Sequence, residues 1–119
     1  MSDRLKELKR EMILCYGLKC WLNELWIPQK RDMITYHHIL ERRNNGHTTW
    51  ENGALLGRSS HDYLNFLDNQ YHNIYKELNG AFIDLNRTYA PPTEDYYDEI
   101  EHILRKVNKY DNYKNKQKK

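Results

Sequence analysis

The chain has 119 residues and a formal net charge of +2, with 30% charged, 39% hydrophobic and 13% aromatic residues. This length fits one domain, the aromatic content argues against full disorder, and no apolar run approaches the roughly 18 residues of a membrane span. Residues 1–15 are too densely charged for a signal peptide. We therefore expect a small cytoplasmic domain without a membrane partner, whose oligomeric state stays open.

The first part of the chain is predicted to be one helix followed by an apolar segment. Apolar residues recur at helical spacing over residues 3–14, which predicts an amphipathic helix. Residues 20–27 form an apolar patch that Pro28 stops, and residues 29–32 form a polar connector. The two cysteines of the chain are fewer than the four ligands of a structural zinc site.

The middle of the chain predicts a β-hairpin. Residues 33–40 are rich in residues that favour strands. A polar loop over residues 41–49 follows and contains the turn signal Asn44-Asn45-Gly46. Residues 54–56 are short and apolar, as expected of a second strand.

Two further helices are predicted after the hairpin. One runs over residues 60–79, begins at a serine cap (Ser59 or Ser60) and ends near Gly80. Residues 82–86 are expected to continue as helix after a kink.

Two prolines then break the chain, and Thr93 is the expected N-cap of a last amphipathic helix. The fold class is therefore α+β and mostly helical. Within one compact domain we expect four segments, which cover residues 1–32, 33–80, 81–111 and 112–119.

Charge is distributed unevenly along the second half of the chain. Residues 61–101 hold two basic and nine acidic residues, whereas residues 102–119 hold seven basic and one acidic residue. A basic tail can neutralise the phosphates of a nucleic acid, or it can simply be a solvated end. The acidic stretch would repel DNA unless it faces away.

Several residues able to bind a metal lie at the corners of the predicted hairpin and helix. Adjacent residues of a strand point to opposite faces, so His37 and His38 cannot have the same role. His61 and Asn65 are four residues apart and share one helix face. A hairpin packed on this helix would bring His37, His61 and Asn65 around one ion.

The spacing H-H-x13-N-x8-H resembles the motif of the HNH, or ββα-metal, endonucleases, and is most similar to small proteins of phage and low-GC bacterial type. The resemblance covers about residues 15–66. It is carried by the stretches Tyr36-His37-His38-Ile39, Trp50-Glu51-Asn52-Gly53-Ala54-Leu55-Leu56 and His61-Asp62-Tyr63-Leu64-Asn65.

The resemblance implies a ββα-metal core that hydrolyses DNA phosphodiester bonds. It assigns His37 and His61 as metal ligands, His38 as the general base and Asn52 as the residue that orients the base and its loop. Asn65 stands where relatives commonly carry a ligand histidine, and is either a ligand or a structural amide. The implied cofactor is one divalent ion, Mg²⁺ or Mn²⁺, with Zn²⁺ or Ni²⁺ as the other candidates, which stabilises the leaving 3′ oxygen. The resemblance also implies a protein encoded by a phage or a bacterium.

The chain departs from this family upstream of the motif. Many relatives carry Tyr-Gly-x-x-Cys-x-x-Cys, but Asn23 stands where the second cysteine would be. We therefore expect no structural zinc, and we expect Trp21, Trp26 and Ile27 to provide apolar packing instead.

Arginines flank the motif and are the expected phosphate contacts, namely Arg42, Arg43 and Arg58. His47 lies in the loop, where it either touches phosphate or is solvated. The alternative function is a catalytically weak or inactive HNH-like module that binds nucleic acid or another protein.

Overall fold

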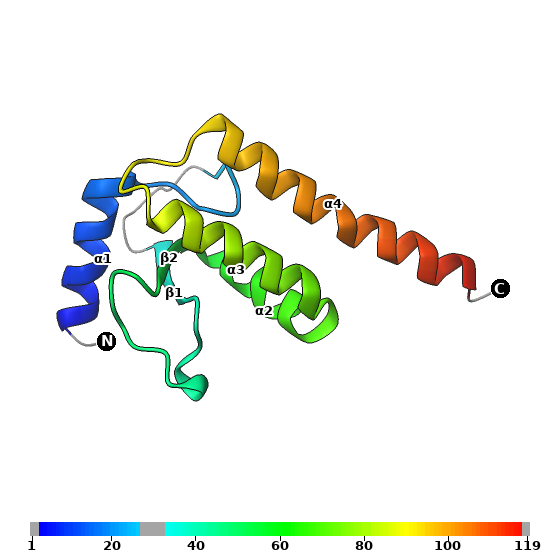
Figure 1. Ribbon diagram of the computed structural model, residues 1–119, viewed down its shortest axis with the longest axis horizontal. Helices are drawn as coiled ribbons and strands as arrows, with labels where there is room; N and C mark the ends of the chain where they lie inside the picture. The colour runs from blue at the N-terminus through cyan, green and yellow to red at the C-terminus, as the bar shows by residue number, and fades with distance from the viewer. Residues whose placement is uncertain (1–2, 27–32, 118–119) are drawn as a thin grey trace.

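A computed structural model describes residues 3–26 and 33–117, although the side chains of Arg43 and of residues 108–117 lie outside the description. The chain is a mostly helical α+β protein, as predicted (Figure 1). Its elements in chain order are α1 (Asp3–Tyr16), β1 (Ile34–His38), a single 3₁₀ turn η2 (Arg42–Asn44), β2 (Gly53–Gly57), α2 (Arg58–Gln70), α3 (His72–Asn86) and α4 (Glu94–Gln117).

The two strands form an antiparallel hairpin, which confirms both strand predictions with shifted ends. Ile34 pairs with Gly57 at one end of the register and His38 pairs with Gly53 at the other. Every residue of β2 is buried. A Cβ atom at Gly53 would lie 2.4 Å from a ring carbon of Tyr36, so the close packing of this strand requires glycine there.

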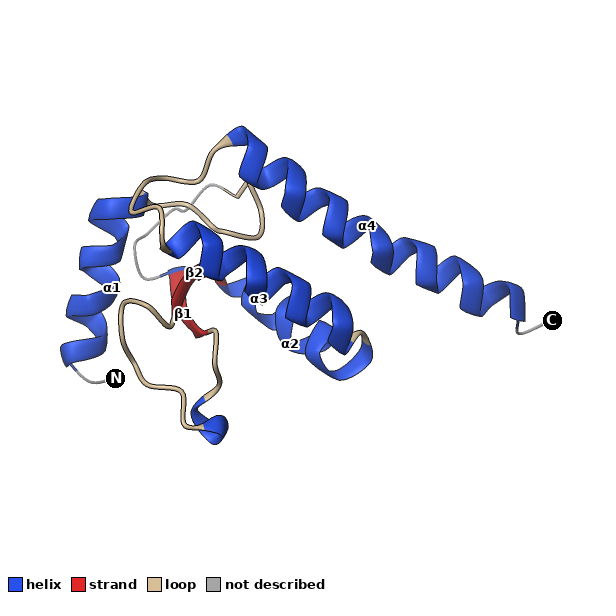
Figure 2. Cartoon of the chain, viewed as in Figure 1, coloured by secondary structure: helices blue, strands red, loops and turns tan. Residues whose placement is uncertain are grey.

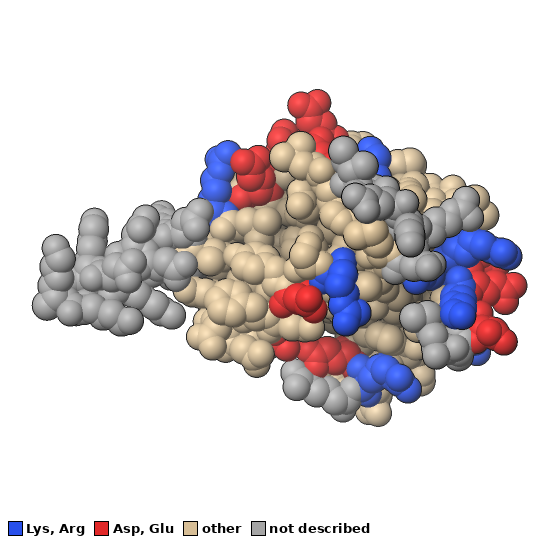
Figure 3. Space-filling model, turned by 180° about the vertical axis from the view of Figure 1, so that it is seen from behind, with Lys and Arg blue, Asp and Glu red and all other residues tan. Residues whose placement is uncertain are grey.

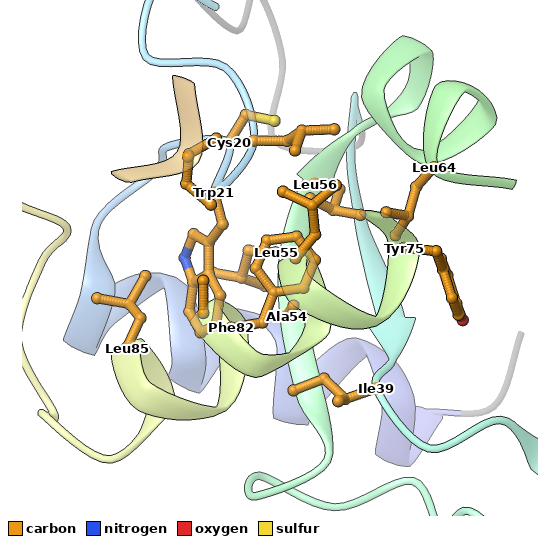
Figure 4. Packing of buried hydrophobic residues seen from close by; sticks show 14 of the residues in the cluster. Cys20, Trp21, Ile39, Ala54, Leu55, Leu56, Leu64, Tyr75, Phe82 and Leu85 are labelled. Atoms are coloured by element: carbon orange, nitrogen blue, oxygen red, sulfur yellow. The ribbon is translucent and has the colours of Figure 1, made fainter. Parts of the chain in front are cut away.

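The hairpin lies between α1 and the pair formed by α2 and α3 (Figure 2). Figure 4 shows Leu55, Leu56 and Phe82 at the centre of the buried cluster. Burial of such apolar side chains contributes about 1.5–3 kcal/mol each to folding. None of the helices within the described residues is long and apolar enough to cross a membrane.

The prediction of a single helix over residues 60–79 is wrong, because this stretch of the chain forms parts of two helices, α2 and α3. Tyr71 separates α2 from α3 with non-helical φ and ψ angles of −141° and 61°. Both helices pack apolar residues on the core, so the 3.6-residue period continues through the break and conceals it. Gly80 does not end a helix but lies inside α3, where nothing is within 4 Å of a Cβ atom built on it. The segment boundary expected between residues 80 and 81 therefore falls within a helix.

Neither serine caps α2, contrary to the prediction. The helix begins two residues earlier than expected, at Arg58, and Gly57 occupies the N-cap position in extended conformation without a side-chain cap. Ser60 is instead buried inside the first turn. A Cβ atom at Gly57 would lie 2.8 Å from a ring carbon of Trp26, so the close packing at this corner favours glycine at the N-cap position.

The last helix is capped as predicted and holds the apolar segment near Cys20. Thr93 Oγ1 accepts a hydrogen bond from the backbone N–H of Tyr96. Tyr96 then donates its hydroxyl proton to the carbonyl of Trp21 at 2.5 Å, and Tyr97 donates to the carbonyl of Cys20 at 2.7 Å. α4 continues as helix to Gln117, past the expected start of a tail at residue 112.

The expected apolar packing of Trp21 and Trp26 is confirmed. The Trp21 side chain is fully buried and packs edge-on against Tyr16 and near Phe82 (Figure 4). Trp26 is partly buried against the core. Ile27, Pro28 and the expected connector over residues 29–32 lie outside the described residues.

Candidate functional site

The two adjacent histidines of β1 lie on opposite faces of the hairpin. His37 is buried, 5% exposed, and its ring packs against Tyr75 and Phe82 of α3. His38 is half-buried on the other face, where its Nε2 atom lies 2.8 Å from the hydroxyl of Thr48. The two side chains therefore meet different surroundings, as strand alternation predicts.

The ring of His61 in α2 lies beside that of His37, with ring centres 5.6 Å apart. Two imidazoles that hold one ion at 2.0–2.1 Å have ring centres roughly 5 Å apart, so this separation is compatible with a shared ion. The structure thus brings together two of the three residues predicted as metal ligands.

A hydrogen bond to Thr35 fixes the tautomer of His61. The Thr35 hydroxyl donates to the carbonyl of Leu56 at 2.8 Å and also lies 2.8 Å from His61 Nδ1. Because a hydroxyl has one proton and that proton goes to a carbonyl, His61 Nδ1 must be the donor in the second bond. The Nε2 atom of His61 therefore carries the lone pair, the form in which imidazole binds metals.

All three histidines are neutral at pH 7. Burial lowers the pKa of His37 from 6.5 to about 4. Burial also lowers the pKa of His61, and the positive charge of Arg58 adds to this against the opposing Asp62 carboxylate. The pKa of His38 is lowered by burial first and by Arg42 second. Neutral rings can ligate an ion or accept a proton, whereas protonated rings can do neither.

Asn52 clamps the loop between the strands. Its amide group donates to the carbonyls of Leu40 and His47, both at 2.9 Å, and its side-chain oxygen accepts the Leu40 N–H at 2.7 Å. The segment fixed in this way leads directly into Thr48, the partner of His38. Asn52 is thus placed to hold the loop that faces His38.

The two amides near the histidine pair differ in position. Asn65 is exposed on α2, and its backbone carbonyl accepts a hydrogen bond from the Asn69 side chain. Asn79 of α3 is half-buried, and its Oδ1 atom lies 2.9 Å from His37 Nε2. Within the described part of the chain, no group of three or more His, Cys, Asp and Glu side chains is arranged to hold a metal ion.

A cleft of about 550 Å³ opens beside His38. Its walls come from the start of α1 and from the inter-strand loop, and the described residues that line them carry cationic and neutral side chains without a carboxylate. The lining residues are Arg4, Leu5, His38, Arg42, His47, Thr48 and Thr49. Arg42 thus lies where a phosphate contact was predicted, whereas Arg58 is exposed near His61, and the side chain of Arg43 lies outside the description.

Sequence reasoning missed Arg4, Asn79 and Asn86. Asn86 is buried and donates to the carbonyls of Trp50 and Gly53 at 2.7 and 2.8 Å, so it fixes the loop where it enters β2. Asn79 and Asn86 lie seven residues apart on the α3 face that also carries Tyr75 and Phe82. Amides recurring on an apolar helix face were the signal that could have found them. Arg4 is 34 positions from His38, and no pattern in the sequence links the two.

Comparison with protein-family models, with curated proteins and with solved structures finds no match to this chain.

Proposed function

We propose that this protein is a metal-dependent HNH-type endonuclease that hydrolyses phosphodiester bonds of DNA. The observation that carries the proposal is the division of roles across β1. A neutral imidazole pair, His37 and His61, lies on one face of the hairpin, and a neutral His38 opens into a cationic cleft on the other. A metal-dependent phosphodiester hydrolase of this class uses both a metal-binding group and a general base.

The donor atoms of His37 and His61 support a divalent ion held by these two residues, with solvent completing the site. Each of the two rings has one nitrogen held by a neighbouring polar side chain, as is usual for histidines that ligate metals. A bound Mg²⁺ or Mn²⁺ would stabilise the negative charge that develops on the leaving 3′ oxygen.

His38 would act as the general base. Its pKa is low enough to keep it neutral at pH 7, so it can take a proton from a water molecule that attacks phosphorus. Thr48 and the loop held by Asn52 fix its ring in the cleft. Attack by water with loss of the 3′ oxygen would leave a 5′-phosphate and a 3′-hydroxyl.

Arg4 and Arg42 support a DNA phosphate in the cleft, because two guanidinium groups in one carboxylate-free cleft attract an anionic backbone. Elsewhere the charge is mixed. On the face drawn in Figure 3, basic and acidic side chains are interspersed. Part of the acidic stretch is also paired, since Glu77 binds Lys106 at 2.7 Å. The cleft beside His38 is therefore the favoured contact with DNA.

Incubation of plasmid DNA with the full chain in Mg²⁺ or Mn²⁺ tests the proposal, with an EDTA-treated sample as the control. We expect metal-dependent nicked or linear DNA with 5′-phosphate ends. Binding of DNA without any cleavage would reject the enzyme and favour the alternative of an inactive HNH-like binding module. Absence of both binding and cleavage would reject DNA as the substrate.

We expect Arg4→Ala and Arg42→Ala to weaken DNA binding about equally for all sequences. Each should lower the slope of log affinity against log salt by about 1, because one phosphate contact is lost. Fluorescence anisotropy in EDTA measures binding without cleavage. Arg105→Ala is the matched control, since Arg105 lies on α4 and pairs with Glu101. A salt slope in the cleft variants equal to that of the control would contradict the assignment.

A further inference from the structure

A polar chain runs behind His37, from β1 through α3 to the loop that carries Arg42. The first link joins His37 Nε2 to Asn79 Oδ1 at 2.9 Å. Tyr75 lies one helical turn before Asn79 on the same helix. The Tyr75 hydroxyl in turn lies 3.0 Å from Glu41 Oε1. His37 and Tyr75 are both buried, so water does not replace these bonds cheaply.

The atoms at each contact set the direction of the bonds. A carboxylate only accepts, so Tyr75 donates its single proton to Glu41. The Asn79 atom that faces His37 is Oδ1, and an amide oxygen accepts only. It follows that His37 carries its proton on Nε2 and its lone pair on Nδ1.

We propose that Asn79 is a positioning residue that fixes His37 as the Nε2–H tautomer and so presents Nδ1 to the divalent ion. The metal part of this inference rests on the proposed function, whereas the tautomer part does not. His61 is fixed in the opposite tautomer by Thr35, with its lone pair on Nε2. The two histidines would thus use different ring nitrogens toward the same ion.

Long-range ¹H–¹⁵N NMR correlations of the metal-free full chain at pH 7 test the tautomers directly. We expect His37 as Nε2–H and His61 as Nδ1–H in the wild type. We expect Asn79→Ala to shift His37 to a mixture of both tautomers and to leave His61 unchanged. Asn79→Asp should keep His37 as Nε2–H, because a carboxylate also accepts. Asn73→Ala, an exposed position on the same helix, is the matched control.

Calorimetric titration with Zn²⁺ supplies the second readout. We expect Asn79→Ala to weaken affinity roughly 10- to 100-fold and Asn79→Asp to retain it. Thermal melting of each variant shows that it is folded, and if Asn79→Ala is not, Asn79→Leu, which keeps a similar side-chain volume without an acceptor, decides on both readouts.

Three results would overturn the role of Asn79. The first is a wild-type His37 protonated on Nδ1. The second is an Asn79→Ala variant with unchanged tautomer and Zn²⁺ affinity. The third is a Zn²⁺-loaded protein in which Nε2 of His37 is the ligand. Absence of Zn²⁺ and Mg²⁺ binding by the wild type would instead reject the proposed function, and the tautomers would still decide on Asn79.

Discussion

Replacement of His38 by alanine is expected to lower DNA cleavage roughly 10²- to 10⁴-fold, the usual contribution of a general base, and to leave metal affinity nearly unchanged. The reason is the position of His38 on the strand. It faces Thr48 and the cationic cleft, whereas its neighbour His37 faces α3 and His61. Single-turnover cleavage rates and calorimetric titration with Mn²⁺ on the same preparation measure both quantities.

His102→Ala is the matched control for this variant, because His102 is exposed on α4. It should cut DNA at the wild-type rate. If His38→Ala loses Mn²⁺ affinity together with activity, His38 is a ligand and the roles of the histidine pair are reversed.

The pH dependence of the cleavage rate is a second test of His38 as the general base. The pKa of His38 is lowered below 6.5, so the neutral base predominates at pH 7 and is lost as the pH falls through the pKa. We therefore expect the rate to fall only on the acidic side. Arg42→Ala removes a positive charge that disfavours the protonated ring, so the pKa of His38 should rise and the acidic limb should move to higher pH. If the acidic limb of the pH–rate profile does not move in Arg42→Ala, the ionisation of His38 does not control the cleavage rate.

His61→Ala is expected to abolish metal-dependent cleavage and to weaken Mn²⁺ affinity more than about 100-fold, which exceeds the usual effect of losing an outer hydrogen-bond partner. His61 and His37 are the two imidazoles at the candidate metal site, and we expect His37 alone not to hold the ion. Calorimetry measures affinity, and plasmid nicking measures activity.

The loss must be separated from unfolding. His61→Ala also removes the hydrogen bond to Thr35, which costs about 1 kcal/mol of the free energy of unfolding. Thr35→Val removes the same bond but keeps the imidazole, so it should bind Mn²⁺ far better than His61→Ala at similar stability. Wild-type cutting by His61→Ala would remove this residue from the site.

Local patterns were sufficient to predict the hairpin and the N-cap of α4, but not the N-cap of α2. Strand-forming residues around a polar turn predicted β1 and β2, and Thr93 was found because capping involves residues only three positions apart. The break at Tyr71 was missed because apolar periodicity continues on both sides of it. Gly80 was misread as a helix end because the packing of α3 against β2 outweighs the roughly 1 kcal/mol cost of glycine in a helix.

The residues of the candidate site also fall into two groups, those that a local pattern predicted and those that only the packing of the helices brings to the site. His37, His38, Asn52 and His61 lie within one local motif, and their spacing predicted them as site residues. Asn79 reaches His37 from α3 across 42 positions, and Arg4 reaches the cleft from α1. Such contacts depend on how helices pack against the hairpin, which a single sequence does not encode as a pattern.

The two tyrosines at the start of α4 affect how the chain folds during synthesis. Their hydroxyls satisfy the carbonyls of Cys20 and Trp21 across 77 and 75 positions, so in a chain made from its N-terminus these bonds can form only after most of the chain has been made. Contacts of such long sequence separation are slow to form. The two strands can pair before the C-terminal third of the chain has left the ribosome. The carbonyls of Cys20 and Trp21 gain their hydroxyl partners only once Tyr96 and Tyr97 have been made. A nascent chain that ends before residue 96 therefore contains the whole histidine motif but lacks the hydrogen bonds that α4 makes to Cys20 and Trp21.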